Sequence, residues 1–140
     1  MQPERLIMSS TIAAGLSGTS SRIVGSADLA TSMGSGTVEV FATPAMIALM
    51  EEAAVDALAP ALPDGLTSVG IYLEVHHLAG TPLQMSVSAT ATVIEVDGRV
   101  ITFEVSATDG LEIIGRGVHR RVIVDGARFV ERVSAKTAHP

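Results

Sequence analysis

The stretch TPAMIALMEEAAVDALA, residues 43–59, decides the fold. Thr43 is a residue type that caps helices, Pro44 suits the first helical position, and neither Gly nor Pro occurs from Ala45 to Ala59. Pro60 then ends the segment. These residues predict one long helix that is apolar nearly all round, and such a helix must be covered by other elements.

Alternating apolar and polar residues after this helix predict an antiparallel meander. The expected strands are 69–78, 83–93, 101–107 and 111–124, with hairpin turns at Asp97-Gly98 and Asp109-Gly110. Shorter strands are expected before the helix, over 22–29 and 37–41. A curved antiparallel sheet wrapped around one central helix is an α+β architecture.

The length of 140 residues suits a single domain. We expect a mobile segment rich in Ser, Thr and Gly over 1–20, a domain over 21–130, and a C-terminal tail over 131–140. The charged residues from Asp125 onward are expected to be partly helical or frayed.

The chain is 47% hydrophobic and 17% charged, with a mean hydropathy of +0.43. So apolar a composition predicts that a partner chain covers part of the surface, as in a homodimer. The net charge of −6 argues against a nucleic-acid partner but leaves room for a small anionic ligand.

The sequence contains no cysteine, which excludes a disulfide scaffold, a Cys-ligated zinc and a thiol nucleophile. No apolar run approaches the roughly 20 residues that span a bilayer. The first ten residues carry Glu4 and Arg5 and lack a signal-peptide core. We therefore expect a cytoplasmic protein with no membrane partner.

Glu51 is the first candidate for chemistry, because helical spacing places it in a stripe with Ile47, Ala48 and Val55. Burial of a carboxylate raises its pKa and makes it a useful base near neutral pH. The alternative is a structural Glu that pairs with an arginine.

The pair His76-His77 is the second candidate. If the strand has no bulge, His77 shares the inward row of Leu73 and Val75, and His76 faces solvent. An inward histidine can act as a base or be a hydrogen-bonded core residue. Adjacent histidines on a strand diverge and no acidic cluster stands near them, so no metal site is expected.

Three further residues are weaker candidates. Thr43 is either a helix cap or a catalytic hydroxyl. Gly70 would let a ligand approach the backbone, whose N–H could stabilise an oxyanion. If no bulge occurs at the glycines near 115–117, Arg121 lies on the row of Leu111 and Ile113, where it could pair with Glu51 or hold a ligand anion. Its neighbour Arg120 is expected at the surface.

Several motifs occur together in one order. They are Phe41-Ala42-Thr43-Pro44, Leu49-Met50-Glu51-Glu52-Ala53, Val69-Gly70, His77-Leu78-Ala79-Gly80-Thr81-Pro82, Val96-Asp97-Gly98-Arg99 and Gly117-Val118-His119-Arg120-Arg121. From about residue 30 to residue 129, the chain resembles the fluoroacetyl-CoA thioesterase-like group of the hot-dog-fold thioesterase superfamily.

The resemblance implies a hot-dog homodimer, able to pair into a dimer of dimers, that hydrolyses acyl-CoA at the subunit interface. Thr43, Glu51 and His77 would be catalytic, the Gly70 amide would bind the thioester carbonyl, and Arg121 would line the site. No cofactor is implied, because coenzyme A is part of the substrate. The alternatives are a non-catalytic acyl-CoA binder, an enoyl-CoA hydratase and a purely structural dimer.

The chain also departs from the group's pattern. Gly34 and Thr37 stand where the fluoroacetyl-specific enzyme has lid phenylalanines, which argues against a fluoroacetyl preference. Gln84 stands where many relatives have Gly, and His119-Arg120-Arg121 replaces a common His-Glu-Arg.

Spacing sets one geometric limit on the catalytic trio. Eight residues of helix rise about 12 Å, so Thr43 and Glu51 cannot touch along one straight helix. Either the helix begins after Thr43, or the two residues come from different subunits, or a long substrate spans them.

Overall fold

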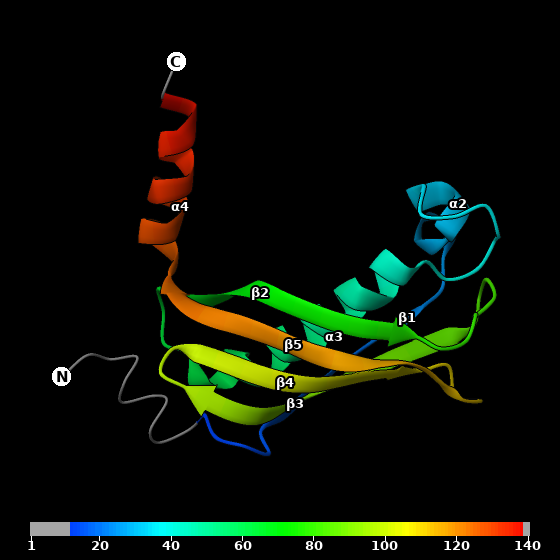
Figure 1. Cartoon of the computed structure of the whole chain (residues 1–140), viewed down its shortest axis with the longest axis horizontal. Helices are drawn as coiled ribbons and strands as arrows, with labels where there is room; N and C mark the ends of the chain where they lie inside the picture. Colours follow the sequence, from blue (N-terminus) through cyan, green and yellow to red (C-terminus); the bar gives the residue numbers. More distant parts are fainter. Residues whose placement is uncertain (1–11, 139–140) are drawn as a thin grey trace.

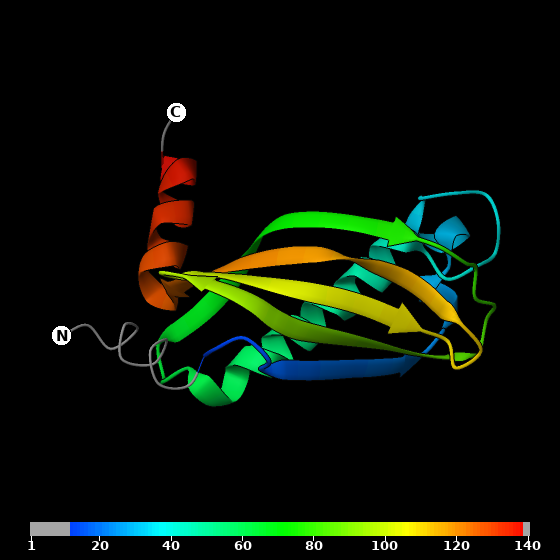
Figure 2. The same ribbon diagram turned by 60° about the horizontal axis from the view of Figure 1, so that its bottom comes forward.

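A computed structural model describes residues 12–138 of the chain. A five-stranded antiparallel sheet curves around one long helix, α3, as Figures 1 and 2 show. The strands lie in the order β1-β3-β4-β5-β2. Their bounds are β1 Ser17–Ile23, β2 Leu66–His77, β3 Ser86–Asp97, β4 Val100–Thr108 and β5 Ile113–Asp125. The α+β hot-dog prediction is therefore confirmed.

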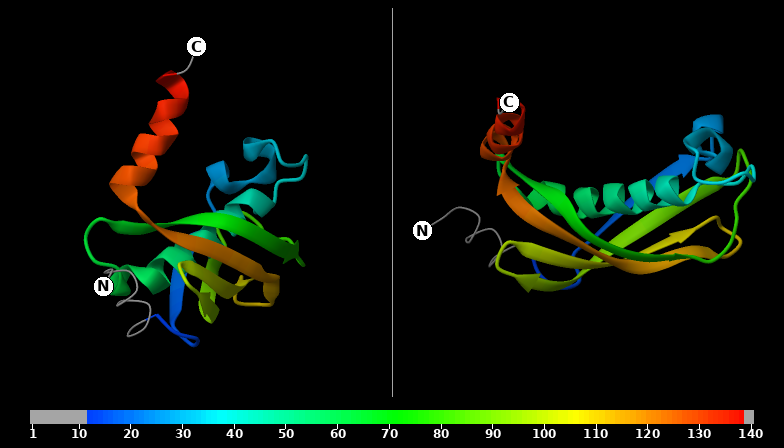
Figure 3. Two further views of the ribbon diagram at one scale, coloured as in Figure 1. Left: turned by 60° about the vertical axis from the view of Figure 1, so that its left-hand side comes forward. Right: turned by 45° about the horizontal axis from the view of Figure 1, so that its top comes forward.

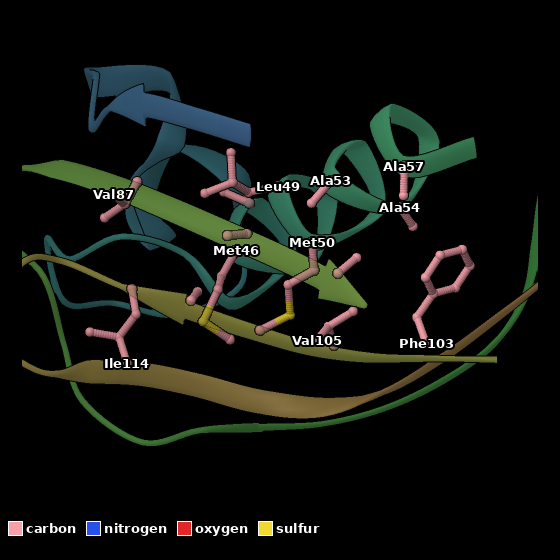
Figure 4. Close-up of a cluster of buried hydrophobic side chains, with 14 of the residues drawn as sticks. Met46, Leu49, Met50, Ala53, Ala54, Ala57, Val87, Phe103, Val105 and Ile114 are labelled. Atoms are coloured by element: carbon pink, nitrogen blue, oxygen red, sulfur yellow. The ribbon is translucent and has the colours of Figure 1, made fainter. Parts of the chain in front are cut away.

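Helix α3, Thr43–Leu58, lies in the concave face of the sheet (Figure 3). Figure 4 shows its side chains Met46, Leu49 and Met50 pointing into the core. The inward rows of the strands pack against them, and both hairpin strands bury alternate residues as their patterns predict, at Val87, Ala89, Ala91, Val93, Ile101, Phe103, Val105 and Ala107.

The start of the domain differs from the prediction. The first strand is β1 and not the expected 22–29, so residues 17–20 belong to the sheet. The expected strand over 37–41 is instead a bend, with one bridge between Leu29 and Phe41. A Cβ at Gly18 would meet the α3 backbone at Ala57 N, at 2.3 Å. Close packing against α3 thus determines where this strand lies. Residues 1–11 of the expected N-terminal segment lie outside the described part of the chain.

Two bulges change which residues share a face. The β2–β5 register shifts between Gly70 and Tyr72, which leaves Ile71 without a strand partner. A second shift, where Ala107 pairs with Gly115 and Thr108 with Ile113, separates Ile113 from the inward row of Arg121. The expected shared row of Leu111, Ile113 and Arg121 is therefore wrong, although Arg121 itself is buried.

Strand β2 lies at the edge of the sheet and has no strand neighbour on one side among the described residues. Ile71 is 52% exposed and Leu73 is 40% exposed, so this edge is apolar. Natural proteins rarely leave a long apolar edge strand uncovered.

The C-terminal part of the chain is helical, in agreement with the prediction for residues after Asp125. Helix α4, Gly126–Ser134, begins where the Asp125 carboxylate accepts a hydrogen bond from Arg128 N, and a short 3-10 helix, Ala135–Ala138, follows. Figure 1 shows α4 projecting away from the sheet. No described helix has the length and apolar character needed to cross a membrane.

Candidate active site

Thr43 is the first residue of α3 and not its cap. The N-cap position belongs to Ala42, which has no capping side chain, so the predicted capping role of Thr43 is wrong. The Thr43 hydroxyl instead lies 2.7 Å from Nδ1 of His77, at the end of β2. The residue is exposed, which leaves this hydroxyl accessible from outside the chain.

His77 faces inward beside Val75, while His76 is exposed, as strand parity predicts. Its Nε2 is buried and has no hydrogen-bond partner among the described residues. Burial lowers the pKa of His77, and the backbone of Ala79 counteracts this only in part. At neutral pH the imidazole is therefore uncharged, the form in which it accepts a proton.

The Thr43–His77 dyad lines a cleft of about 450 Å³. Residues of the segment before the helix, among them Thr37, also line this cleft, as does Ala30 of helix α2, Ala30–Met33. This volume suits a small ligand group.

A second polar cluster surrounds Glu51, about two turns along α3 from the dyad. Arg121 Nη1 donates to Glu51 Oε2 over 3.0 Å, and Arg121 Nε donates to Ser68 Oγ over 2.8 Å. The Glu51 side chain is 37% exposed, so the expected burial of this carboxylate is not complete within one chain. The alternative of a Glu–Arg pair is present.

His119 belongs to this cluster and was not among the predicted site residues. Its Nδ1 lies 2.9 Å from the Tyr72 carbonyl, which can only accept, so Nδ1 carries the hydrogen. Nε2 then accepts from Arg121 Nη1 over 3.1 Å. Burial lowers the pKa of His119, and the Arg121 charge lowers it further. A neutral histidine thus helps to hold Arg121 against Glu51.

Gly70 lies against the same cluster. A Cβ at this position would lie 2.6 Å from Glu51 Oε2 and 3.2 Å from His119 Cε1. The bulge at Ile71 explains how Gly70 and His77 both face inward, although they are seven residues apart on one strand. Close approach to Glu51 therefore accounts for a glycine here.

The structure does not bring the three predicted catalytic residues together within one chain. Helix α3 is continuous from Thr43 through Glu51, which excludes a helix that begins later, and eight helical residues separate them by about 12 Å. Thr43 and His77 form one cluster, and Glu51, Gly70 and Arg121 form another. Among residues 12–138, no group of three metal-ligating side chains is present.

Comparison with known proteins places this chain in a family. The profile described as fluoroacetyl-CoA-specific thioesterase matches residues 24–127. The chain belongs to this family. It is 43% identical, over 99 residues, to a fluoroacetyl-CoA thioesterase of Streptantibioticus cattleyicolor, and the match covers 71% of each protein.

Two solved structures extend the comparison. A variant of the fluoroacetyl-CoA-specific thioesterase in complex with fluoroacetate and CoA has 35% identity and a TM-score of 0.78, over 84% of this chain and 98% of that one. A thioesterase-superfamily protein of Thermus thermophilus has 27% identity and a TM-score of 0.82, over 92% and 95%. The predicted class, an acyl-CoA thioesterase, is confirmed at the level of the family.

Sequence reasoning missed His119 because a histidine in a strand carries no local signal of its partners. The motif Gly117-Val118-His119-Arg120-Arg121 contained it, and its parity with Arg121 placed both on one face. What the pattern could not provide was the position of the Tyr72 carbonyl, which fixes the imidazole.

Proposed function

We propose that this thioesterase hydrolyses short or medium acyl-CoA esters to the free acid and coenzyme A. The observation that carries the proposal is the 2.7 Å contact between Thr43 Oγ1 and His77 Nδ1 on the wall of a cleft. A hydroxyl against a neutral imidazole is the arrangement that general-base catalysis requires.

The proposed chemistry uses both clusters. His77 accepts a proton as the Thr43 hydroxyl, or a water that it orients, attacks the thioester carbonyl carbon. A backbone N–H at Gly70 stabilises the negative oxygen that forms. His77 then returns the proton to the departing sulfur. If water was the attacking group, hydrolysis is then complete, and the role of Glu51, fixed by Arg121, is to orient that water. If Thr43 attacked, Glu51 takes a proton from the water that cleaves the acyl–Thr43 ester and passes it to the Thr43 oxygen, which restores the hydroxyl.

The two clusters meet if the site is formed by two copies of the chain. The apolar edge of β2 continues into an exposed stripe on α3 that includes Ala48 and Val55. Antiparallel pairing of β2 with a second copy, about an axis between Leu73 and Glu74, would set His77 of one chain opposite Gly70 of the other. We therefore propose a homodimer as the active unit, whether or not two dimers associate further.

The acyl group is proposed to be small but not restricted to fluoroacetyl. Thr37 lines the cleft, and Gly34 ends helix α2 with a φ of 77°, so the lid phenylalanines of the fluoroacetyl-specific enzyme have no counterpart at these positions. The reaction as proposed needs no cofactor beyond the coenzyme A of its substrate. We place it in the cytoplasm, where acyl-CoA esters are used.

The test is release of free thiol, followed with a disulfide dye, from acetyl-, fluoroacetyl-, butyryl- and octanoyl-CoA. Glu51→Gln and His77→Ala are each expected to lower kcat by about a hundredfold or more. Arg116→Ala, an exposed residue of β5 outside both clusters, is the control. If the wild-type dimer releases no thiol from any ester, or if both variants keep full turnover, the proposal is wrong.

A further inference from the structure

A groove of about 1040 Å³ lies between α4 and the start of β2, outside both polar clusters. Arg99, in the turn between β3 and β4, lines it together with Arg128 and Arg132 of α4. The two helical arginines are four residues apart and so lie on one face of α4. Three of the nine Lys and Arg residues of an acidic chain therefore gather at one concave surface.

These three guanidinium groups are free to bind a ligand. None of them makes an ion pair or a side-chain hydrogen bond within the described part of the chain. Arg132 only stacks over the ring of Phe129. By contrast, Arg22 and Arg121 both pair with carboxylates. Guanidinium groups bind phosphate oxygens by paired, charge-assisted hydrogen bonds.

The groove also carries acidic side chains. Asp64 and Glu131 line it, and Asp125 does so while it caps α4. A purely anionic ligand would be repelled by these carboxylates. A ligand that combines phosphates with hydroxyl and amine donors would use both kinds of side chain.

A second depression joins this groove to the Glu51 cluster. It has a volume of about 310 Å³, shares the segment Pro63–Leu66 with the groove, and extends to Ser68, the hydrogen-bond partner of Arg121. Its walls include the apolar side chains of Val55 and Leu58. A continuous surface thus connects the arginines to the proposed oxyanion site.

The length of this surface matches one part of the proposed substrate. Four strand residues separate Leu66, in the groove, from Gly70, which is about 13 Å. The pantetheine arm of coenzyme A has about as many bonds between its sulfur and its phosphorus as the backbone of four residues of extended peptide. A thioester at Gly70 would therefore place its phosphates at the arginines.

We propose that Arg99, Arg128 and Arg132 bind the phosphates of the 3′-phospho-ADP end of the acyl-CoA substrate. The inference rests on the proposed function and adds a nucleotide subsite to it. The pantetheine arm runs along the depression beside Val55 and Leu58, and the carboxylates of the groove accept hydrogen bonds from the ribose and adenine.

The experiment compares two esters of the same acyl group, acyl-CoA and acyl-pantetheine, which lacks the nucleotide. In the full-length Arg128→Ala/Arg132→Ala variant, KM for acyl-CoA is expected to rise about tenfold, from two exposed contacts of about threefold each. The kcat values and the kinetics with acyl-pantetheine stay as in the wild type. Alanine favours helix, so α4 is retained, and Arg116→Ala is the matched control.

Each outcome decides the proposal. An unchanged KM for acyl-CoA, or an equal rise in KM for both esters, overturns the proposal. A smaller rise in KM with acyl-dephospho-CoA than with acyl-CoA supports it and assigns one arginine to the 3′-phosphate. If the wild type cleaves neither ester, the proposed function fails separately, and calorimetry with coenzyme A tests the subsite. Binding that weakens about tenfold in the double variant then supports the subsite, whereas equal or absent binding refutes it.

Discussion

The two polar clusters of this thioesterase differ in how completely their side chains are partnered. Thr43 and His77 make one contact with each other, and Nε2 of His77 has no partner among the described residues. In the other cluster, Arg121 donates to Glu51 and to both the hydroxyl and the carbonyl of Ser68, while its Nη1 also contacts His119.

This difference separates a reactive group from a fixed support. A side chain that exchanges protons needs a basic nitrogen next to the reacting hydroxyl and few other hydrogen bonds, as His77 has. A side chain that orients a carboxylate is most effective when its own position is fixed by several hydrogen bonds, as that of Arg121 is. The first cluster is therefore incomplete without a ligand or a second chain, and the second is preorganised.

The largest expected effect comes from mixing two inactive variants. If the clusters of different subunits form one site, a heterodimer of Glu51→Gln and His77→Ala chains has one site that carries both defects and one that carries neither. Statistical mixing makes about half of the dimers mixed, so about a quarter of wild-type turnover should return. Refolding the two purified variants together and assaying thiol release measures this.

A mixture that stays inactive, although native mass spectrometry shows heterodimers, would place the whole trio in one subunit. The two clusters would then act on one substrate only if that substrate spans the roughly 12 Å of helix between them. Each variant refolded alone is the control.

The next effect tests the support directly. Gly70→Ala would set a methyl group 2.6 Å from Glu51 Oε2 and so displace the carboxylate from Arg121. We expect kcat to fall by about a hundredfold, in line with the loss of a positioned base. Gly25→Ala, whose Cβ would have ordinary contact with Asp28 at 3.5 Å, is the matched control.

An active Gly70→Ala enzyme would show that Glu51 does not need its present position. The dimer fraction, measured by sedimentation, separates this effect from a loss of assembly, because Gly70 also lies on the edge strand.

Local signals in the sequence predicted the parts of the fold that neighbouring residues determine. Thr43-Pro44 and Pro60 bound the helix to within two residues, and Asp97-Gly98 marked the hairpin between β3 and β4. Strand β1 could not be predicted, because its polar residues form a strand only through pairing with β3 and packing of Gly18 on α3.

The site was predictable by residue type but not by arrangement. Residue parity selected His77 over His76, and the apolar stripe drew attention to Glu51. The bulge at Ile71, which puts Gly70 on the face of His77, depends on the pairing of β2 with β5 and leaves no mark on the local pattern. The separation of Thr43 from Glu51 was foreseeable from helical rise alone.

A smaller effect distinguishes the clusters by pH. Burial lowers the pKa of His119 and of His77 in the folded chain, so below the ordinary histidine value of about 6.5 the unfolded chain binds more protons. The contribution of these two histidines to the free energy of unfolding should be fully present above that pH. It should fall as the pH decreases, by at most about 1.4 kcal/mol per pH unit for each histidine.

His119→Gln removes the titration of the second cluster and leaves that of His77. Urea unfolding at pH 8, 6.5 and 5.5 should therefore show a smaller acid loss in the variant than in the wild type. The values at pH 8 give the intrinsic effect of the substitution, and identical slopes would mean that His119 is not held neutral.

The smallest effect concerns a residue that belongs to neither cluster. Gln84 has a φ of 71°, the left-handed region that a side chain disfavours by about 1 to 2 kcal/mol. The turn before β3 holds this backbone conformation, in which Gln84 N donates to the Val24 carbonyl over 2.8 Å.

Gln84→Gly should relieve the strain, partly offset by the greater entropy of glycine in the unfolded chain. We expect the free energy of unfolding to rise by about 0.5 to 1 kcal/mol, with kcat and KM unchanged because neither cluster is touched. Denaturant midpoints at constant m-value measure the first part. A change in turnover instead would mean that the turn at Gln84, in the loop of residues 78–85 that follows His77, controls the position of that histidine. Both clusters would then depend on backbone that belongs to neither.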